Sequence, residues 1–331
     1  MKKITVKSPT RVDLAGGTLD LWPLYNFTGG AKTVNVAIDI YTTVEIQERN
    51  DQSIEIVSKD LNYNKMFSSL DEFLENPDTQ LDLLKSQLRF WRPQKGFQLV
   101  TSSESPVGAG LGGSSSLTIS LIKAFSQFTD KALCSVHDTV HLAHNIEAQV
   151  LKTPTGTQDY YPAVCGGLNI LDYSFTGIAH KVLPIAGSEL EKNFILVYTG
   201  KAHHSGLNNF EVLTHAVQKD PVTLRALASL KIVAEETAQA VEAKKFQLLP
   251  ELFQKEYSAR VQLAKAFSSP EIEKLHEVSL QAGAEAVKIC GAGGGGCVLV
   301  WSPEQKRQKV VEACVKNGFK VMDAKPVAPL L

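Results

Sequence analysis

The chain has 331 residues, of which 44% are hydrophobic and 21% are charged, so it can bury a sizeable core and its length favours two domains. Its 34 lysines and arginines nearly balance its 35 aspartates and glutamates, which argues against a nucleic-acid or membrane partner and favours a small molecule. The five cysteines form no CxxC pair, the N-terminus lacks the apolar stretch of a signal peptide, and no stretch is long enough to span a membrane. We therefore expect a cytoplasmic protein with reduced thiols.

The first half of the chain alternates predicted strands and helices. Alternating polar and apolar residues predict a strand at 3–7, a β-branched run predicts a long strand at 33–45, and a further strand is expected at 97–100. Apolar residues at helical spacing predict helices at 114–128 and 135–151. A glycine-rich segment therefore joins a strand to the N-terminus of a helix.

Beyond about residue 190 the pattern follows a β-α-β-β-α-β order with an enlarged first helical segment. The strands expected there are 194–199, 286–290, 297–301 and 319–323. Ser-Pro pairs at 269–270 and 302–303 predict helix starts, and glycines at 283 and 318 predict helix ends.

Residues 105–116 (SPVGAGLGGSSS) carry the most informative motif in the chain. Glycines let backbone N–H groups approach an anion where the dipole of the following helix favours negative charge, so we interpret the segment as a phosphate cradle. A tight connection with a serine cap is the alternative. The segment is not a Walker P-loop, and its literal GxGxxG lacks the acid-ended strand of a Rossmann unit. The cradle residues are Pro106, Gly108, Ala109, Gly110, Leu111, Gly112, Gly113, Ser114, Ser115 and Ser116.

Two further loops are candidates for a site. The glycine cluster at 291–296 joins two predicted strands and is longer and richer in glycine than a plain hairpin needs. Close approach of a ligand explains it, with a flexible hairpin as the alternative. The turn at 155–159 would leave Asp159 near the preceding helix, although an Asx-turn residue alone needs no ligand.

Glu147 lies in the middle of an apolar stripe on the predicted helix at 135–151. A lone carboxylate there is costly unless a cation or hydrogen-bond donors compensate it, so we predict a metal ion or an arginine partner. A misplaced helix start is the alternative. The same helix carries His137, His141 and His144, but they lack the glutamate of an HExxH motif and do not indicate a zinc site.

Three glycine-rich stretches, 9–20 (PTRVDLAGGTLD), 106–116 and 291–296, match in order and spacing the three motifs of the GHMP kinase superfamily. Within it, the first motif, the Gln-Asp pair at 158–159 followed by GGLN, and the YTG segment at 198–200 resemble the D-glycero-D-manno-heptose 7-phosphate kinase and L-fucokinase branch. The resemblance spans the whole chain.

The resemblance implies an α+β fold of two domains. The N-terminal domain, at 1–190, would be like ribosomal protein S5 domain 2, and the C-terminal domain, at 191–331, would be ferredoxin-like, which agrees with the order of elements above. It also implies an ATP-dependent small-molecule kinase that uses ATP and Mg²⁺.

By position, the resemblance implies that Asp159 lies at the acceptor hydroxyl and that Arg11 neutralises charge on the transferred phosphoryl group. It assigns Mg²⁺ to Ser114 and Glu147, which supplies the cation that the apolar stripe requires. Asp20 matches the family's acceptor for a sugar hydroxyl. The other expected substrate contacts are Gly17, Thr18, Gln158, His203, Gly293 and Gly294.

Three positions depart from the family pattern. Thr18 replaces a third glycine, and Gly113 replaces a serine, which makes Ser115 a rival of Ser114 for the metal. A histidine pair at 203–204 stands where relatives place an Arg-Ser pair. Because neutral imidazole is a poorer phosphate clamp than guanidinium, we favour an acceptor without a phosphate there, with two surface histidines as the alternative.

We therefore expect phosphorylation of a sugar hydroxyl, namely the anomeric C1 hydroxyl of a hexose, a heptose or one of their phosphates. One alternative is a kinase of the same superfamily that acts on mevalonate or homoserine. Another is a non-catalytic sugar sensor, against which the presence of both Arg11 and Asp159 argues. A homodimer is left open.

Overall fold

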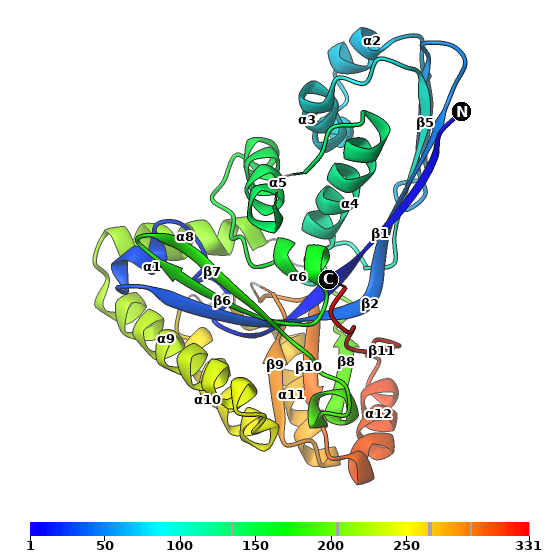
Figure 1. Cartoon of the computed structure of the whole chain (residues 1–331). Coiled ribbons are helices and arrows are strands. Elements are labelled where there is room, and N and C mark those ends of the chain that lie inside the picture. The colour runs from blue at the N-terminus through cyan, green and yellow to red at the C-terminus, as the bar shows by residue number, and fades with distance from the viewer. Residues whose placement is uncertain (134, 203–204, 264–266, 292, 331) are drawn as a thin grey trace.

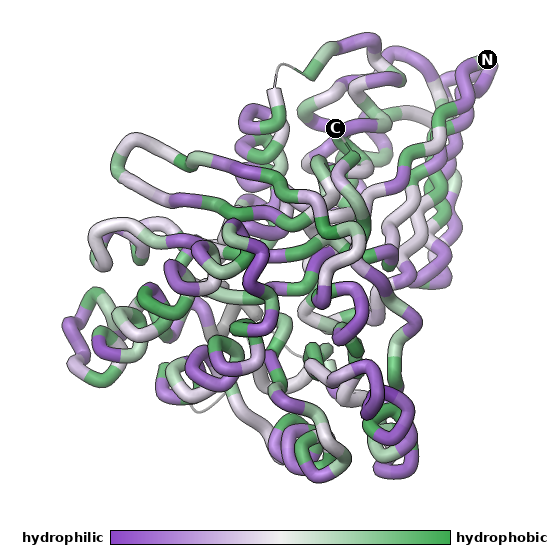
Figure 2. Tube along the Cα trace, turned by 60° about the horizontal axis from the view of Figure 1, so that its bottom comes forward, coloured by the Kyte–Doolittle hydropathy of each residue, from purple (hydrophilic) through white to green (hydrophobic). Residues whose placement is uncertain are grey.

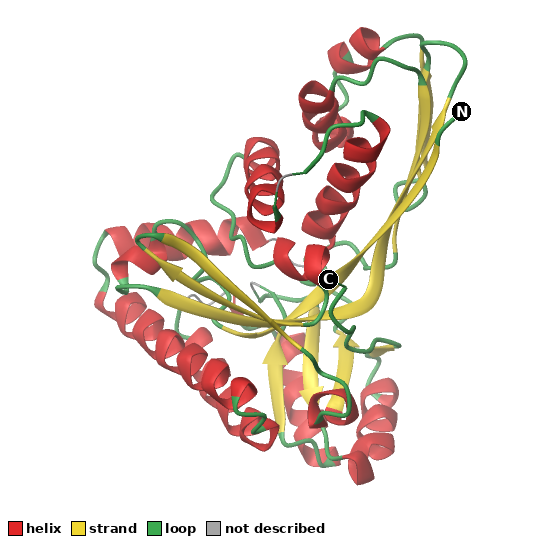
Figure 3. Ribbon diagram, viewed as in Figure 1, coloured by secondary structure: helices red, strands yellow, loops and turns green. Residues whose placement is uncertain are grey.

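The computed structural model describes residues 1–133, 135–202, 205–263, 267–291 and 293–330. They form two β-sheets with helices packed against them (Figures 1 and 3). Strands in the middle of the molecule carry hydrophobic stretches, whereas hydrophilic residues are frequent along the peripheral helices (Figure 2). The predicted α+β fold in two parts is confirmed.

The larger sheet has seven strands in the described part of the chain, in the order β4-β3-β5-β2-β6-β7 with β1 paired to β2. The strands are β1 (Lys3–Ala15), β2 (Ala31–Glu48), β3 (Ile54–Ser58), β4 (Tyr63–Phe67), β5 (Phe97–Ser103), β6 (Leu168–Ser174) and β7 (Gly177–Leu183). Strand β2 is antiparallel to β1, β5 and β6, so it forms the centre of the sheet.

Strand β1 is longer than the sequence pattern predicts. Exposed and buried residues alternate only as far as Lys7, and residues 8–15 are buried without interruption, which hides the period of two. The register of β1 on β2 shifts after Pro9 and again after Asp13. Because Arg11 and Asp13 are two residues apart in the extended strand, their side chains point to the same face of β1.

Helices cover one face of the sheet where β1, β2 and β5 run together (Figure 1). They include α3 (Asp82–Trp91), α4 (Gly113–Phe128) and α5 (Val136–Leu151), and the short helices of this part are α1 (Leu24–Phe27), α2 (Leu70–Glu75) and α6 (Tyr160–Cys165). Phe125 of α4 packs edge-on against Phe97 of β5, with ring centroids 5.6 Å apart. The Ser135 side chain caps α5 by accepting the Asp138 N–H, so both predicted helices are confirmed.

The smaller sheet has the order β11-β8-β10-β9, with every pair antiparallel. Its strands are β8 (Phe194–Tyr198), β9 (Ala286–Ile289), β10 (Cys297–Trp301) and β11 (Lys320–Met322). With α11 (Pro270–Ala282) before β9 and α12 (Arg307–Lys316) before β11, the predicted β-α-β-β-α-β order is confirmed. This is the ferredoxin-like arrangement.

The helix ends of this part follow the predictions with one exception. Ser269 caps α11 by accepting the Ile272 N–H, and Gly283 ends it with a left-handed φ. The start predicted at Ser302 is wrong, because a 3₁₀ turn at Glu304–Lys306 precedes α12 and the Ser302 side chain does not cap it. Further helices enlarge the first helical segment, as predicted: α8 (Ser205–Val217), α9 (Pro221–Glu242) and α10 (Leu249–Arg260). The short helix α7 (Glu189–Asn193) precedes β8.

A continuous hydrophobic core joins the two sheets. Val12 and Val36 from the larger sheet share one buried cluster with Leu299 and Trp301 of β10 and with Phe253 of α10. The Phe253 and Trp301 rings lie 5.9 Å apart. The sheets divide between β7 and β8, and the domain boundary between residues 190 and 191 stays a prediction.

Residues 325–330, which we call the C-terminal strap, return from the smaller sheet to the larger one. Its backbone bonds are Asp39 N to Lys325 O (2.9 Å), Val327 N to Ala37 O (2.8 Å), Gly167 N to Val327 O (3.0 Å) and Leu330 N to Cys165 O (2.7 Å). Figure 1 shows the C-terminus beside α6. The strap therefore holds the turn that ends α6.

Among the described residues no helix is long and apolar enough to cross a membrane. The thiols of Cys165, Cys290, Cys297 and Cys314 are free and buried. Cys134 lies outside the described residues.

Candidate active site

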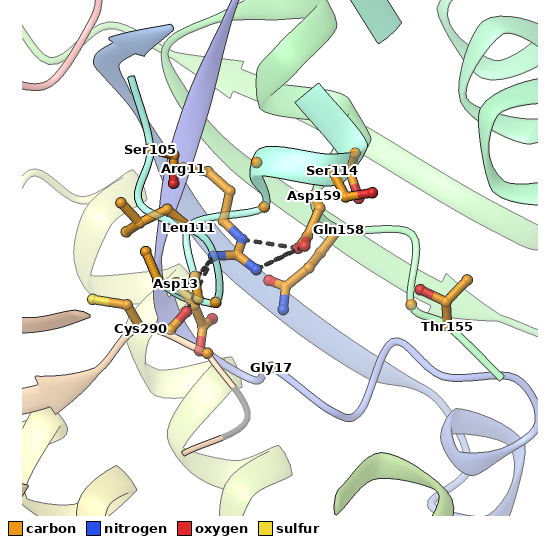
Figure 4. A pocket seen from close by; sticks show the side chains of 18 of the residues that line it. Arg11, Asp13, Gly17, Ser105, Leu111, Ser114, Thr155, Gln158, Asp159 and Cys290 are labelled. Atoms are coloured by element: carbon orange, nitrogen blue, oxygen red, sulfur yellow. Dashed lines mark hydrogen bonds and ion pairs between the residues drawn. The ribbon is translucent and has the colours of Figure 1, made fainter. Parts of the chain in front are cut away.

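A cavity of about 400 Å³ lies between the parts of the chain that build the two sheets. On one side it is lined by β1, by the loop before α4 and by the segment at 155–159. On the other side it is lined by Asn209, Arg260 and Cys290. Figure 4 shows the side chains that gather there.

Backbone hydrogen bonds fix the glycine-rich loop that lines this cavity. Arg11 N donates to Leu111 O at 3.0 Å, and Cys297 N donates to Ala109 O at 2.6 Å, so the loop is tied to β1 and to β10. The left-handed backbone region is used by Gly108, Gly110 and Gly112, with φ of 66°, 74° and 68°. Residues with a side chain rarely adopt this backbone conformation, which explains why glycines occupy these three positions.

Most of the predicted cradle residues line the cavity. They are Pro106 and residues 108–115, joined by Val107 and Leu117, which the sequence did not single out. Ser116 is not among the lining residues: its Oγ donates to Ser8 O at 2.9 Å and lies 2.8 Å from Thr42 Oγ1, so it joins α4 to the sheet. Helix α4 begins in the cavity wall without an acidic residue in its first turn, which favours an anion there.

Arg11 and Asp159 form a bidentate ion pair inside the cavity (Figure 4). Nε of Arg11 donates to Oδ1 of Asp159 at 2.8 Å, and Nη2 donates to Oδ2 at 2.7 Å. Nη1 donates to the carbonyls of Gly110 and Cys290. Burial alone would lower the pKa of Arg11, but the carboxylates of Asp159 and Asp13 raise it above its ordinary value. Asp159 makes no cap bond to α6, so its carboxylate serves the pair rather than a turn.

Glu147 of α5 is 4% exposed and has hydroxyl partners. Its Oε2 accepts a hydrogen bond from Ser115 Oγ at 3.0 Å and another from the Tyr160 hydroxyl at 2.6 Å. Burial raises the pKa of Glu147, and the hydroxyl hydrogen bonds only partly oppose this. No arginine of the described residues pairs with Glu147, so the predicted arginine partner is wrong. The Tyr160 hydroxyl is a partner that the sequence did not indicate.

The residues near Glu147 offer the oxygen ligands that Mg²⁺ prefers. Ser114 and Glu147 both line the cavity. The described residues contain no group of three or more His, Cys, Asp or Glu that could hold a metal ion by themselves. A Mg²⁺ ion here would therefore complete its coordination with phosphate oxygens and water. Ser115 donates to Glu147, and the exposed residue Ser114 is also close enough to lower the pKa of Glu147 by a hydrogen bond from its side chain.

Asp20 and Gln158 line the cavity and contact each other. Asp20 is 4% exposed, and its Oδ2 accepts the Gln158 N–H at 3.0 Å. Burial, followed by the nearby Asp159 carboxylate, raises the pKa of Asp20 to about 7. A Cβ on Gly156 would lie only 1.8 Å from Asp20 Oδ2, so the loop that carries Gly156 rests directly on this carboxylate.

Gly17 and Thr18 also line the cavity. Thr18 has a φ of 81°, a left-handed conformation that a glycine adopts without strain, which accounts for the glycine expected at this position from the family pattern. Its Oγ1 lies 3.4 Å from Oδ1 of Asn209, a residue that the sequence did not indicate.

The structure does not bring every predicted substrate contact into the cavity. Gly293 and Gly294 are absent from its lining among the described residues, and they pack against the backbone of Phe267 instead. Gly291, from the same loop, does line the cavity. His203 lies outside the described residues.

A buried network of four charges adjoins the cavity, and sequence reasoning missed it. Its members are Asp13 of β1, Glu256 and Arg260 of α10, and Lys288 of β9, with side-chain exposures of 2%, 0%, 1% and 0%. Lys288 Nζ lies 2.8 Å from Asp13 Oδ2 and 3.1 Å from Glu256 Oε1. Arg260 Nη2 lies 3.4 Å and 2.6 Å from the same two oxygens. The two negative charges thus balance the two positive charges, and the network joins β1 to α10 and β9.

A glycine loop that feeds a helix N-terminus, beside a carboxylate paired with an arginine, is the arrangement of a phosphotransferase for small molecules. Residues 79–167 match the GHMP kinases N-terminal domain, and residues 237–320 match the GHMP kinases C-terminal domain. The chain belongs to the GHMP kinase family and is an ATP-dependent kinase.

Individual relatives cover almost the whole chain. The chain is 30% identical to D-glycero-alpha-D-manno-heptose 7-phosphate kinase of Campylobacter jejuni, with 98% of this chain and 96% of the relative covered. It is 25% identical to mevalonate kinase of Methanocaldococcus jannaschii, with 97% and 98% covered. The crystal structure of a D-glycero-D-manno-heptose 1-phosphate kinase from Bacteroides thetaiotaomicron has the same fold, with a TM-score of 0.78, 24% identity and 99% and 97% covered.

Proposed function

We propose that the protein is a sugar kinase that transfers the γ-phosphoryl group of ATP to the anomeric C1 hydroxyl of a hexose, a heptose or one of their phosphates. The 30% identity to a heptose 7-phosphate kinase supports the sugar as acceptor class. The match of Asp20 and of the Gln158-Asp159 pair to the same branch supports C1 as the position.

One contact carries this proposal. The Asp159 carboxylate lies between Arg11 and the glycine loop, since a Cβ on Gly112 would be 3.1 Å from Asp159 Oδ2. A proton acceptor, a fixed cation and a phosphate cradle therefore meet at one point. A sugar sensor without catalysis would not need this combination.

In the proposed reaction, Asp159 takes the proton of the acceptor hydroxyl while the hydroxyl oxygen forms a bond to the γ-phosphorus atom. The bond between that phosphorus and the oxygen of ADP breaks, and ADP leaves. Arg11 balances negative charge beside the transferred group, and its bonds to Gly110 and Cys290 hold it in place.

Ser114 and Glu147 are the proposed Mg²⁺ ligands. When bound, Mg²⁺ neutralises charge on the nucleotide phosphates. Glu147→Gln should therefore weaken binding of MgATP more than binding of metal-free ATP in calorimetric titrations. Equal losses for both forms would show that Glu147 acts through Ser115 and Tyr160 alone.

A coupled ADP-release assay tests the acceptor class. The panel would contain hexoses, heptoses and their phosphates, with mevalonate and homoserine as competing acceptors, and NMR of the product would locate the new phosphate. We expect turnover with a sugar and a phosphate at C1. Turnover with mevalonate alone would identify a different GHMP kinase, and the 25% identity to a mevalonate kinase makes this the necessary comparison.

A further inference from the structure

Two side-chain oxygens of the cavity wall lack a protein partner. Asp13 and Gln158 are 1% and 6% exposed, and both line the cavity. Oδ1 of Asp13 and Oε1 of Gln158 are buried, and neither has a hydrogen-bond partner among the described residues. A buried acceptor without a donor is unfavourable, and because both side chains line the cavity, a ligand bound there can supply the missing donors.

These two residues meet at one place next to Gly17. A Cβ on Gly17 would lie 2.7 Å from Asp13 Oδ2, 3.0 Å from Gln158 Nε2 and 3.1 Å from Arg260 Nη2. Figure 4 shows Asp13 and Gln158 in the neighbourhood of the Arg11–Asp159 pair. The two side chains therefore lie next to each other, near the carboxylate of Asp159.

The charge network explains why Asp13 keeps one oxygen free. Lys288 and Arg260 both approach Oδ2 of Asp13, at 2.8 Å and 3.4 Å. Arg260 also donates to Glu256 Oε1 at 2.6 Å and to Gly17 O at 3.1 Å. Both cations are thus engaged on one side of the carboxylate, and the other oxygen has no cation.

The described lining offers no free cation for an anionic acceptor. Its basic residues are Arg11 and Arg260, and each is already paired with carboxylates. The acidic residues Asp13 and Asp20 also line the cavity, and besides burial and the Asp159 carboxylate, the charge of Asp13 contributes to the raised pKa of Asp20. A phosphate or carboxylate group beside them would find no unpaired cation among the described lining residues, whereas hydroxyl groups can donate to their oxygens.

We propose, on the basis of the sugar kinase function proposed above, that the acceptor is an uncharged polyol whose hydroxyls donate to Asp13 Oδ1 and Gln158 Oε1. Asp13 is then a specificity-determining residue of the site. Arg260 and Lys288 are positioning residues, because they hold the opposite oxygen of Asp13 and leave Oδ1 for the ligand.

The first test compares kcat/KM for matched pairs of acceptors, a neutral hexose or heptose and its terminal phosphate ester. The neutral sugar should be preferred by about tenfold or more, which corresponds to one hydrogen bond gained or lost in binding. A preference for the phosphate ester would overturn the uncharged acceptor and leave the sugar kinase proposal standing. Absence of ADP release with every sugar would overturn both.

The second test separates binding from stability with two matched variants. Asp13→Asn and Glu256→Gln each remove one negative charge from the same buried network, but Glu256 does not line the cavity. Asp13→Asn should raise the acceptor KM by about tenfold or more with the ATP KM within about twofold. Glu256→Gln, which keeps Oδ1 of Asp13, should raise the acceptor KM by less. An equal rise of the acceptor KM in both variants would show that Asp13 is structural only.

Gln158→Met provides a test that does not depend on the network. Methionine has a similar size but cannot accept a strong hydrogen bond. The variant should keep the thermal midpoint and the ATP KM while the acceptor KM rises by about tenfold. An unchanged acceptor KM would overturn the assignment even if Asp13→Asn failed to fold.

Discussion

Asp159 and Asp20 are two carboxylates of one cavity with different surroundings. The Asp159 side chain is 24% exposed and is held by both arms of the Arg11 guanidinium. Asp20 is buried and accepts a backbone hydrogen bond from Gln158. Because its pKa is raised to about 7, Asp20 changes charge in the neutral range. The two acids can therefore take different roles in one reaction.

Asp159→Asn should keep the shape of the site and remove the base. We expect kcat to fall by about 10²–10⁴-fold with little change in nucleotide affinity. Steady-state kinetics and ATP titration measure the two effects. Asp172→Asn, on β6 outside the cavity lining, is the control and should behave like the wild type. Near-normal turnover by a folded Asp159→Asn protein would rule out this base.

Asp20→Asn should remove a pH dependence from folding. The pKa of Asp20 is about 7 in the folded protein against an ordinary value of 3.8, so between these values only the folded chain keeps the proton. Its stabilising contribution is complete below about pH 4 and is lost as the pH rises to about 7. Urea denaturation from pH 4 to 8 should show the free energy of unfolding of Asp20→Asn rising relative to the wild type. A constant difference would contradict the raised pKa.

At the scale of elements, the loop at 155–157 controls the position of Asp20. His144 of α5 holds this loop by a bond of 3.0 Å between its Nε2 and Thr155 O. Burial lowers the pKa of His144, which favours the neutral ring. Helix α5 thus contacts the loop beside Asp20 and also carries Glu147.

Gly156→Ala should displace Asp20, because the added Cβ would lie 1.8 Å from its Oδ2. We expect a higher acceptor KM and a lower thermal midpoint, with the ATP KM unchanged. In the Asp20→Ala background the same alanine should cost less stability, since the clashing carboxylate is gone. Additive losses in the double variant would mean that the strain lies elsewhere in the loop.

Elements with a local signal could be predicted from the sequence. Helix α5 has a serine cap and a regular apolar stripe, and the strands of the smaller sheet lie between clear helix ends. Strand β1 was underestimated because its second half is buried on both faces and loses its alternation. At Ser302 a 3₁₀ turn takes the place of a capped helix start. Most residues of the cradle could be predicted because its shape depends on the backbone conformation of its glycines, and glycines are visible in the sequence.

At the scale of the whole molecule, the part of the cavity wall formed by Asp13 and Arg260 depends on contacts that sequence spacing does not reveal. Asp13 and Lys288 are 275 positions apart, and neither has a local signal. Only Glu256 and Arg260 stand at helical spacing, as an i, i+4 pair on α10. Such a network becomes visible only when both sheets are in place.

Deleting residues 325–331 should destabilise the protein and lower kcat. The deletion removes the backbone bonds of the C-terminal strap to Asp39, Ala37, Gly167 and Cys165. At about 1 kcal/mol for each bond, the free energy of unfolding should fall by several kcal/mol. Thermal unfolding and steady-state kinetics measure the effects. Unchanged kcat in a destabilised but folded protein would show that the strap does not help to place Asp159.

The strap also bears on the order in which the chain becomes functional. Lys325 bonds to Asp39 across 286 positions, and such distant pairings close late in folding. The strap also bonds to Cys165 and Gly167, at the turn that ends α6. The element that follows Asp159 is therefore held by residues near the far end of the chain, and its surroundings are complete only after residues 325–330 have folded back onto the larger sheet.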